Sequence, residues 1–230
     1  MTKIYCDIAD KKLIKFFTKK KIIKGFTTNP SLIRKSGAKN YKSYCLKLLK
    51  LTSKPISFEV FADNENEMIS QGREISKWGK NVYVKVPVLN SKGTFMGNVI
   101  SELNTNNIKL NITAVYKINQ VKNILNKINR RTSVIISIFV GRMADSGKDP
   151  IPIINQSIKL ARKYKNVQIL WASTREAYNY KQAKDLKCDI ITVPPAIIEK
   201  IENFGKSDLD LTIDTVKGFL FDSKRSKFKI

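Results

Sequence analysis

The chain has 230 residues, of which 42% are hydrophobic, and this length and composition suit one globular domain with a large core. Its 43 Lys and Arg residues against 19 Asp and Glu residues give a formal charge of +24, which favours anionic partners. The absence of histidine excludes Ser-His and Cys-His nucleophile systems and metal sites with histidine ligands.

Short apolar runs alternate with longer amphipathic segments, a pattern typical of repeated β-α units around a parallel sheet. Strands are predicted at residues 3–8, 22–27, 56–61, 82–88, 109–115, 133–140, 167–172 and 189–193, and helices at 65–79, 118–130, 152–164 and 175–186. The predicted fold class is α/β, a single (β/α)8 TIM barrel over residues 1–205, with a doubly wound open sheet as the alternative. Residues 206–230 form a predicted helical tail, which packs on the barrel or on a neighbouring subunit.

Polar residues end the first two predicted strands, and in a (β/α)8 barrel the active site lies at the carboxyl ends of the strands. Asp7 is either a site carboxylate or the N-cap of the helix that follows. The second strand continues into Thr27, Asn29 and Pro30. Asn29 as an N-cap and Pro30 at the first helical position are a sufficient structural explanation for both residues.

The fourth predicted strand places one lysine inside an apolar run. Every second residue of 82–88 is valine, so Tyr83 and Lys85 share the opposite face. Lys85 either extends to solvent at the strand end or is held desolvated, where burial favours the neutral amine. The second alternative makes Lys85 a candidate nucleophile.

The neighbouring strands supply polar groups at the same level of the barrel. The third strand carries Glu59 between apolar residues, and buried carboxylates are uncommon without a partner. The fifth strand carries Asn111 and Thr113 on one face. Together with Asp7, these side chains predict an acid-base group around the Lys85 amine.

The sixth and seventh strands lead to a second polar group. Ser137 and Arg142 follow the sixth strand, while Ser173 and Arg175 follow the seventh and are expected to open a helix. Guanidinium forks and helix N-terminal amides suit a phosphate, so an anion-binding cradle is predicted. Ordinary surface charge is the alternative for the arginines.

Several classes of partner and cofactor are not expected. The three cysteines form no CxxC motif, which indicates reduced thiols in a cytoplasmic protein without a zinc cluster. Neither common phosphate-binding glycine loop is present, so no cofactor and no metal are predicted. No apolar run is long enough for a membrane span. The chain also lacks a run of five or more consecutive basic residues, a pattern that would indicate nucleic-acid binding. A basic nucleic-acid-binding barrel without catalysis is kept as a remote alternative.

Three segments carry a resemblance to a known family: residues 25–31 (GFTTNPS), 84–87 (VKVP) and 139–142 (FVGR). With them, the chain resembles the transaldolase family, including its small fructose-6-phosphate aldolase-like branch. The resemblance implies a cofactor-free Schiff-base enzyme of carbohydrate metabolism, in the pentose phosphate pathway, that acts on sugar phosphates. It also implies a homo-oligomer, with ten subunits as the expected number, in which the terminal helix contacts a neighbouring subunit.

The resemblance assigns a role to each candidate residue. Lys85 is expected to attack the ketose carbonyl and form an imine, and Asp7 to take and return the proton of the C4 hydroxyl. Glu59 and Thr113 are expected to position a catalytic water. The substrate-binding residues implied for the dihydroxyacetone portion are Thr27, Asn29, Asn111 and Ser137, and those for the phosphate are Arg142, Ser173 and Arg175.

Two positions favour one activity within the family. Transaldolases resemble this chain in having Glu at position 59 and Phe at position 139, where fructose-6-phosphate aldolases typically have Gln and Tyr. Phe139 cannot donate the hydrogen bond that helps release free dihydroxyacetone, so transfer is favoured over release. An aldolase, or an enzyme for another phosphorylated or sulfonated ketose, is the alternative. Ile138 and the segment 143–145 depart from the family pattern, so the resemblance implies less about loop geometry and substrate choice than about the core chemistry.

Overall fold

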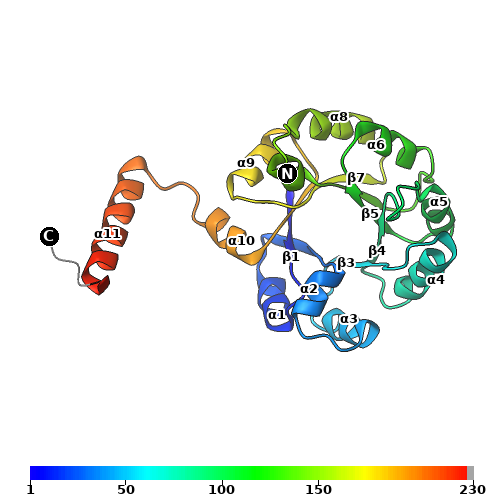
Figure 1. The fold of residues 1–230 in the computed structure, drawn as a ribbon, viewed down its shortest axis with the longest axis horizontal. Helices are drawn as coiled ribbons and strands as arrows, with labels where there is room; N and C mark the ends of the chain where they lie inside the picture. The colour runs from blue at the N-terminus through cyan, green and yellow to red at the C-terminus, as the bar shows by residue number, and fades with distance from the viewer. Residues whose placement is uncertain (227–230) are drawn as a thin grey trace.

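The computed structural model describes residues 1–226, and its eight parallel strands close into a barrel in sequence order (Figure 1). The predicted (β/α)8 barrel is therefore confirmed, and the alternative prediction of a doubly wound open sheet is wrong. The strands are β1 (Lys3–Asp7), β2 (Ile23–Thr27), β3 (Ile56–Glu59), β4 (Val82–Pro87), β5 (Leu110–Val115), β6 (Val134–Ile138), β7 (Val167–Trp171) and β8 (Ile190–Val193).

Helices surround the barrel as an outer ring, as Figure 1 shows. They are α1 (Lys11–Lys19), α2 (Pro30–Lys35), α3 (Tyr41–Leu49), α4 (Glu65–Ser76), α5 (Gly97–Thr105), α6 (Ile118–Leu125), α7 (Val140–Asp145), α8 (Ile151–Ala161), α9 (Tyr178–Asp185), α10 (Pro195–Glu202) and α11 (Asp208–Ser226). Four of them correspond to the predicted helical segments, which end earlier in the structure than the apolar spacing indicated.

The main core lies between the strands and the outer helices. Val82, Val84 and Val86 of β4 are buried there, because every second side chain of a strand points to the same face. A second, smaller cluster that includes Tyr5, Ile135 and Ile190 completes the core. Gly25 of β2 faces Tyr5 closely: an added Cβ would lie 2.5 Å from the Tyr5 ring.

The strand register places the polar side chains of the third, fourth and fifth strands beside one another. Glu59 pairs with Lys85, Lys85 pairs with Asn111, and Pro87 pairs with Thr113. On the two preceding strands, Asp7 of β1 pairs with Thr27 of β2. All of these residues except Asn111 lie in the carboxyl-terminal halves of their strands, so the register gathers them toward one end of the barrel.

The helix α11 stands apart from the barrel beyond α10 (Figure 1). No residue of α11 is buried, although the helix carries a series of large apolar side chains. Residues 227–230 of the predicted tail lie outside the described residues. Among the helices that the structure describes, none is long and apolar enough to cross a membrane.

Candidate active site

A cavity of about 270 Å³ opens at the carboxyl ends of the strands. A pocket in this position is where (β/α)8 barrels place their active sites, because eight βα loops meet there. The predicted site residues that line it are Asp7, Thr27, Asn29, Lys85, Asn111, Thr113, Ser137, Phe139, Arg142, Ser173 and Arg175. Glu59 does not line the cavity and instead contacts Lys85 from the adjacent strand.

Lys85 is buried, with 8% of its surface exposed, so the alternative in which it extends to solvent is wrong. Its Nζ lies 3.1 Å from Oε2 of Glu59 and donates to the carbonyl oxygen of Thr28 at 3.2 Å. The hydroxyl of Tyr41, from α3, holds the end of β3 in place. It donates to the Glu59 carbonyl oxygen and accepts from the Glu59 amide, so Glu59 is fixed beside the amine.

Asp7 belongs to a short chain of hydroxyl groups. Thr27 Oγ1 donates to Asp7 Oδ1 at 2.6 Å, and because that uses its only proton, Thr192 Oγ1 donates to Thr27 across 2.5 Å. Burial raises the pKa of the Asp7 carboxyl, while the Thr27 hydrogen bond and the charge of Lys85 oppose that shift. The N-cap of α1 is Asp10. The structural explanation of Asp7 as a cap is therefore wrong.

Asn111 is fully buried and fixed at both ends of its side chain. Ser137 Oγ donates to its Oδ1 at 2.6 Å, and its Nδ2 donates to Ser57 Oγ at 3.0 Å. Among the described residues, the buried Thr113 hydroxyl has no hydrogen-bond partner. Ala114 follows in a left-handed conformation, with φ of 59°, where the β5–β6 register shifts. Such bulges re-aim neighbouring side chains, and here Thr113 lines the cavity.

Asn29 has a structural role as well as its place at the cavity. Its Oδ1 accepts from the Leu32 amide at 2.9 Å, and Pro30 occupies the first turn of α2. The predicted N-cap is therefore confirmed. Because Oδ1 is used by the helix, the amide Nδ2 is the group that Asn29 can offer to a ligand.

The arginines lie at the rim of the cavity, but no helix begins at Arg175. That prediction is wrong, because α9 begins at Tyr178. The backbone amides of Arg175 and Glu176 donate to Asn179 Oδ1 at 3.1 and 3.3 Å, so a capping side chain already uses them. The anion cradle consequently depends on side chains rather than on helix N-terminal amides.

Gly141 allows the two parts of this rim to meet. A Cβ at Gly141 would lie 1.6 Å from the carbonyl oxygen of Ser173, a separation that no side chain tolerates. Ser173 itself has a positive φ of 63°. The start of α7 therefore touches the loop after β7, and this contact holds Arg142 and Ser173 at the same cavity.

The two arginines are oriented by different groups. The Arg142 guanidinium lies 5.5 Å from the centre of the Phe139 ring. The ring carries no charge, so this contact does not neutralise the guanidinium. Arg175 donates to both oxygens of Asp145 through Nε and Nη2, at 2.5 to 3.0 Å. The Arg175 guanidinium lowers the pKa of the Asp145 carboxyl through these hydrogen bonds.

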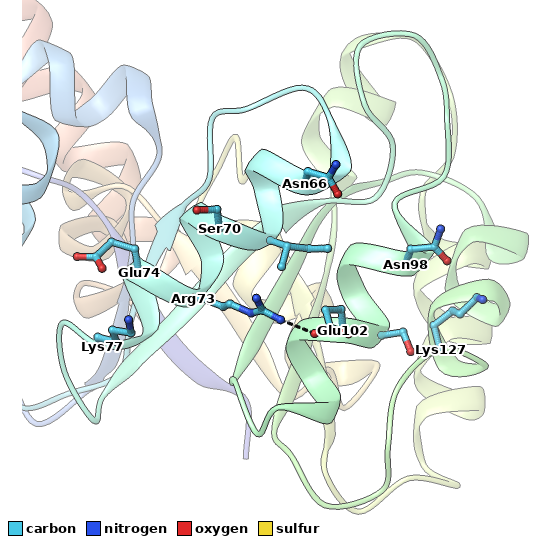
Figure 2. Close-up of a pocket in the computed structure, with 10 residues that line it drawn as sticks. Asn66, Ser70, Arg73, Glu74, Lys77, Asn98, Glu102 and Lys127 are labelled. Carbon is cyan, nitrogen blue, oxygen red and sulfur yellow. Dashed lines mark hydrogen bonds and ion pairs between the residues drawn. The ribbon is translucent and has the colours of Figure 1, made fainter.

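A larger groove of about 760 Å³ lies on the outer surface, between α4 and α5 (Figure 2). Figure 2 shows that the Arg73–Glu102 ion pair, at 2.5 Å, crosses it. The groove is open and lined by surface residues of the outer helices, away from the strand ends. Its chemistry is that of a solvated helix surface, so the cavity with Lys85 is the better candidate site.

Sequence reasoning missed several residues of the site. Thr192 lines the cavity and contacts Thr27, and its signal was a single polar residue in the apolar eighth strand. Thr174 donates to the Thr192 carbonyl oxygen and also lines the cavity. Tyr41 and Ser57 act on Glu59 and Asn111 from outside the cavity, and no local pattern marks them.

The fold and the cavity define a (β/α)8-barrel protein with a buried lysine, two carboxylates and two arginines at the carboxyl ends of its strands. The sequence model of the Transaldolase/Fructose-6-phosphate aldolase family matches residues 4–229. The chain therefore belongs to the transaldolase/fructose-6-phosphate aldolase family and is an aldolase- or transaldolase-type enzyme.

Relatives and solved structures agree with this assignment. A protein of Dehalococcoides mccartyi named "Probable transaldolase" is 32% identical over 208 residues, which cover 90% of this chain and 93% of the relative. One of Thermoplasma volcanium with the same name is 32% identical and covers 91% and 92%. The 4-hydroxy-tetrahydrodipicolinate synthase of Methylacidiphilum fumariolicum SolV has a TM-score of 0.62 at 12% identity, covering 86% of this chain and 69% of that chain. This structural likeness shows the fold alone.

The raised pKa of Asp7 predicts how the Asp7→Asn variant responds to pH. Because burial disfavours the charged carboxylate, the wild type loses stability as the pH rises through the folded-state pKa. Asp7→Asn should therefore raise the melting temperature near pH 7 by roughly 2–4 °C. The gain should shrink as the pH falls toward about 3.9, the ordinary aspartate pKa.

Thermal unfolding followed by circular dichroism across this pH range is the measurement. Asp63→Asn is the control, and its change in melting temperature near pH 7 should have the opposite sign, because hydrogen bonds from Ser91 lower the pKa of Asp63. A difference between wild type and Asp7→Asn that stays constant with pH would contradict the account.

Proposed function

We propose that the chain is a transaldolase that transfers a dihydroxyacetone unit between ketose and aldose phosphates through an imine on Lys85. The observation that carries the proposal is the Lys85 amine, buried at the cavity and 3.1 Å from a carboxylate. An amine becomes a nucleophile only after it loses a proton, and Glu59 is positioned to receive it. The names of the similar proteins support the same activity.

In the proposed reaction, Lys85 Nζ attacks the ketose C2 carbonyl to form a carbinolamine, which loses water to give the iminium. Glu59 and Thr113 hold the water molecule that leaves here and returns in hydrolysis. The unpartnered Thr113 hydroxyl supports this role, because a buried hydroxyl requires a hydrogen-bond partner.

Asp7 then takes the proton of the C4 hydroxyl. The C3–C4 bond breaks, its electrons pass into the iminium to form the enamine, and the aldose phosphate leaves. A raised pKa suits Asp7 to this step, because a carboxylate that holds its proton more readily is the better base. When the acceptor aldose arrives, C3 attacks its carbonyl carbon and Asp7 returns the proton.

The remaining residues are proposed to hold the substrate. Asn111 and Ser137 form a fixed pair that suits the hydroxyls of the dihydroxyacetone portion, together with Thr27 and Asn29. Arg142, Ser173 and Arg175 suit the phosphate. The proposed substrates are sedoheptulose 7-phosphate and glyceraldehyde 3-phosphate, with erythrose 4-phosphate and fructose 6-phosphate as products.

Phe139 supports transfer rather than release. Its ring packs against Tyr116, with 5.7 Å between the ring centres, and lies beside Arg142. It offers no hydroxyl to a water that would protonate the enamine, so the enamine persists until an acceptor aldose binds. An aldolase, or an enzyme for another phosphorylated or sulfonated ketose, is the competing assignment.

We also propose that the enzyme assembles through α11. Its exposed apolar side chains would remain in water in an isolated chain, and burial against a second copy would remove that surface. They are Leu209, Leu211, Ile213, Val216, Phe219, Leu220 and Phe221.

Replacement of Lys85 tests the catalytic assignment. With fructose 6-phosphate as donor and erythrose 4-phosphate as acceptor, Lys85→Met should lower kcat/KM by at least about a thousandfold, because the covalent step is lost. Lys80→Met, at an exposed lysine just before the same strand, is the matched control and should keep its activity. Turnover of fructose 6-phosphate without an acceptor would instead favour the aldolase.

Removal of residues 206–230 tests the assembly. The wild type should be an oligomer in size-exclusion chromatography with light scattering, and the shortened chain should elute as a folded monomer. The barrel should persist because no residue of α11 is buried in the isolated chain. A monomeric wild type, or an oligomer that survives the deletion, would refute the proposed role of α11.

A further inference from the structure

We propose that Asp145 competes with the substrate phosphate for the Arg175 guanidinium and so reduces the preference of the enzyme for phosphorylated substrates. The inference rests on the proposed function, because it concerns the same anion cradle. Asp145 lies in the segment 143–145, which departs from the family pattern.

The geometry of the Arg175–Asp145 pair is that of a bound anion. Arg175 Nε lies 3.0 and 2.9 Å from the two Asp145 oxygens, and Nη2 lies 2.5 Å from Oδ2. Two donors of one guanidinium therefore meet both oxygens of one carboxylate, which is the arrangement that arginine also forms with phosphate. Asp145 occupies the Nε edge that a phosphate would use.

Arg175 lies at the cavity, and its pair with Asp145 is open to exchange. Arg175 lines the cavity, and the side chains of Arg175 and Asp145 are 47% and 51% exposed. Exposed ion pairs contribute little net stability, since water replaces the lost contacts. A phosphate that enters the cavity can therefore displace the carboxylate from Arg175 without disturbing the core.

The charge of Asp145 also reaches the second arginine. Arg142 adds to the attraction that lowers the pKa of Asp145, so the carboxylate lies within the field of both guanidinium groups. Among residues 1–226, Arg142 has no carboxylate within ion-pair distance. The cradle thus holds two positive charges and one negative charge, and a phosphate dianion meets a net attraction weaker than the arginines alone would give.

A consequence for specificity follows from this charge count. The weakened attraction acts on a phosphate group and leaves the dihydroxyacetone portion unaffected, since that portion is held by neutral side chains elsewhere in the cavity. Asp145 therefore narrows the difference in kcat/KM between a phosphorylated acceptor and the same acceptor without phosphate. Its replacement by a neutral residue should widen that difference.

The first test measures binding and requires no turnover. Inorganic phosphate is titrated calorimetrically into the full-length wild type, Asp145→Asn, Asp145→Glu and Asp149→Asn. Asp145→Asn should bind phosphate about three- to tenfold more tightly, because one repelling charge is removed while an amide oxygen still accepts from Arg175. Asp145→Glu keeps the charge and should resemble the wild type.

Asp149→Asn is the matched control. It makes the same change in net charge four positions along the chain, and asparagine preserves the contact of Asp149 with the Ile151 amide. Its phosphate affinity should equal that of the wild type. Equal affinity in Asp145→Asn and wild type, weaker affinity in Asp145→Asn, or an equal gain in Asp149→Asn would overturn the proposal.

The second test uses kinetics with glyceraldehyde 3-phosphate and glyceraldehyde as acceptors. In Asp145→Asn the KM for the phosphorylated acceptor should fall about three- to tenfold, while the KM for glyceraldehyde should not change. If the wild type transfers no three-carbon unit but the binding result holds, the proposed function fails and the competition at Arg175 stands. If transfer occurs but the two KM values change together, the competition at Arg175 is refuted and the proposed function stands.

Discussion

The ion pair between Lys85 and Glu59 is the interaction on which the candidate site depends. It joins adjacent strands at the end of the barrel, and only 10% and 18% of the two side chains are exposed. A buried charge requires a partner, so each residue makes the other tolerable in an apolar barrel. The surrounding groups fix this pair: the Tyr41 hydroxyl holds the Glu59 backbone, and the Thr28 carbonyl accepts from the amine.

The rest of the cavity is arranged around that pair by the register of a closed barrel. Because neighbouring strands are parallel and in sequence order, Asp7 is brought from the start of the chain to the same rim as the two arginines. The lysine side is buried and tightly hydrogen-bonded, whereas the arginine side is half exposed and held by a carboxylate. The proposed imine chemistry uses the first environment, and the proposed exchange of phosphorylated substrates uses the second.

The alternation of short apolar runs with longer amphipathic segments predicted all eight strands to within two residues at each end, because barrel strands must bury apolar side chains against the helices. The order of these strands also predicted that Lys85 and Asn111 lie on neighbouring strands at the same part of the barrel. Contacts between distant segments could not be predicted. Tyr41 acts on Glu59 from another helix, and Asp145 reaches Arg175 across 30 positions of the chain. The start of α9 was misplaced because Asn179 caps a loop that apolar spacing does not describe.

Covalent trapping tests whether Lys85 forms the proposed imine. The enzyme is incubated with fructose 6-phosphate and borohydride, and the modified peptide is identified by mass spectrometry. We expect one adduct, on Lys85, that is absent from Lys85→Met and retained in Lys54→Met, where another partly buried lysine is removed. No adduct in the wild type, or an adduct that persists in Lys85→Met, would contradict it.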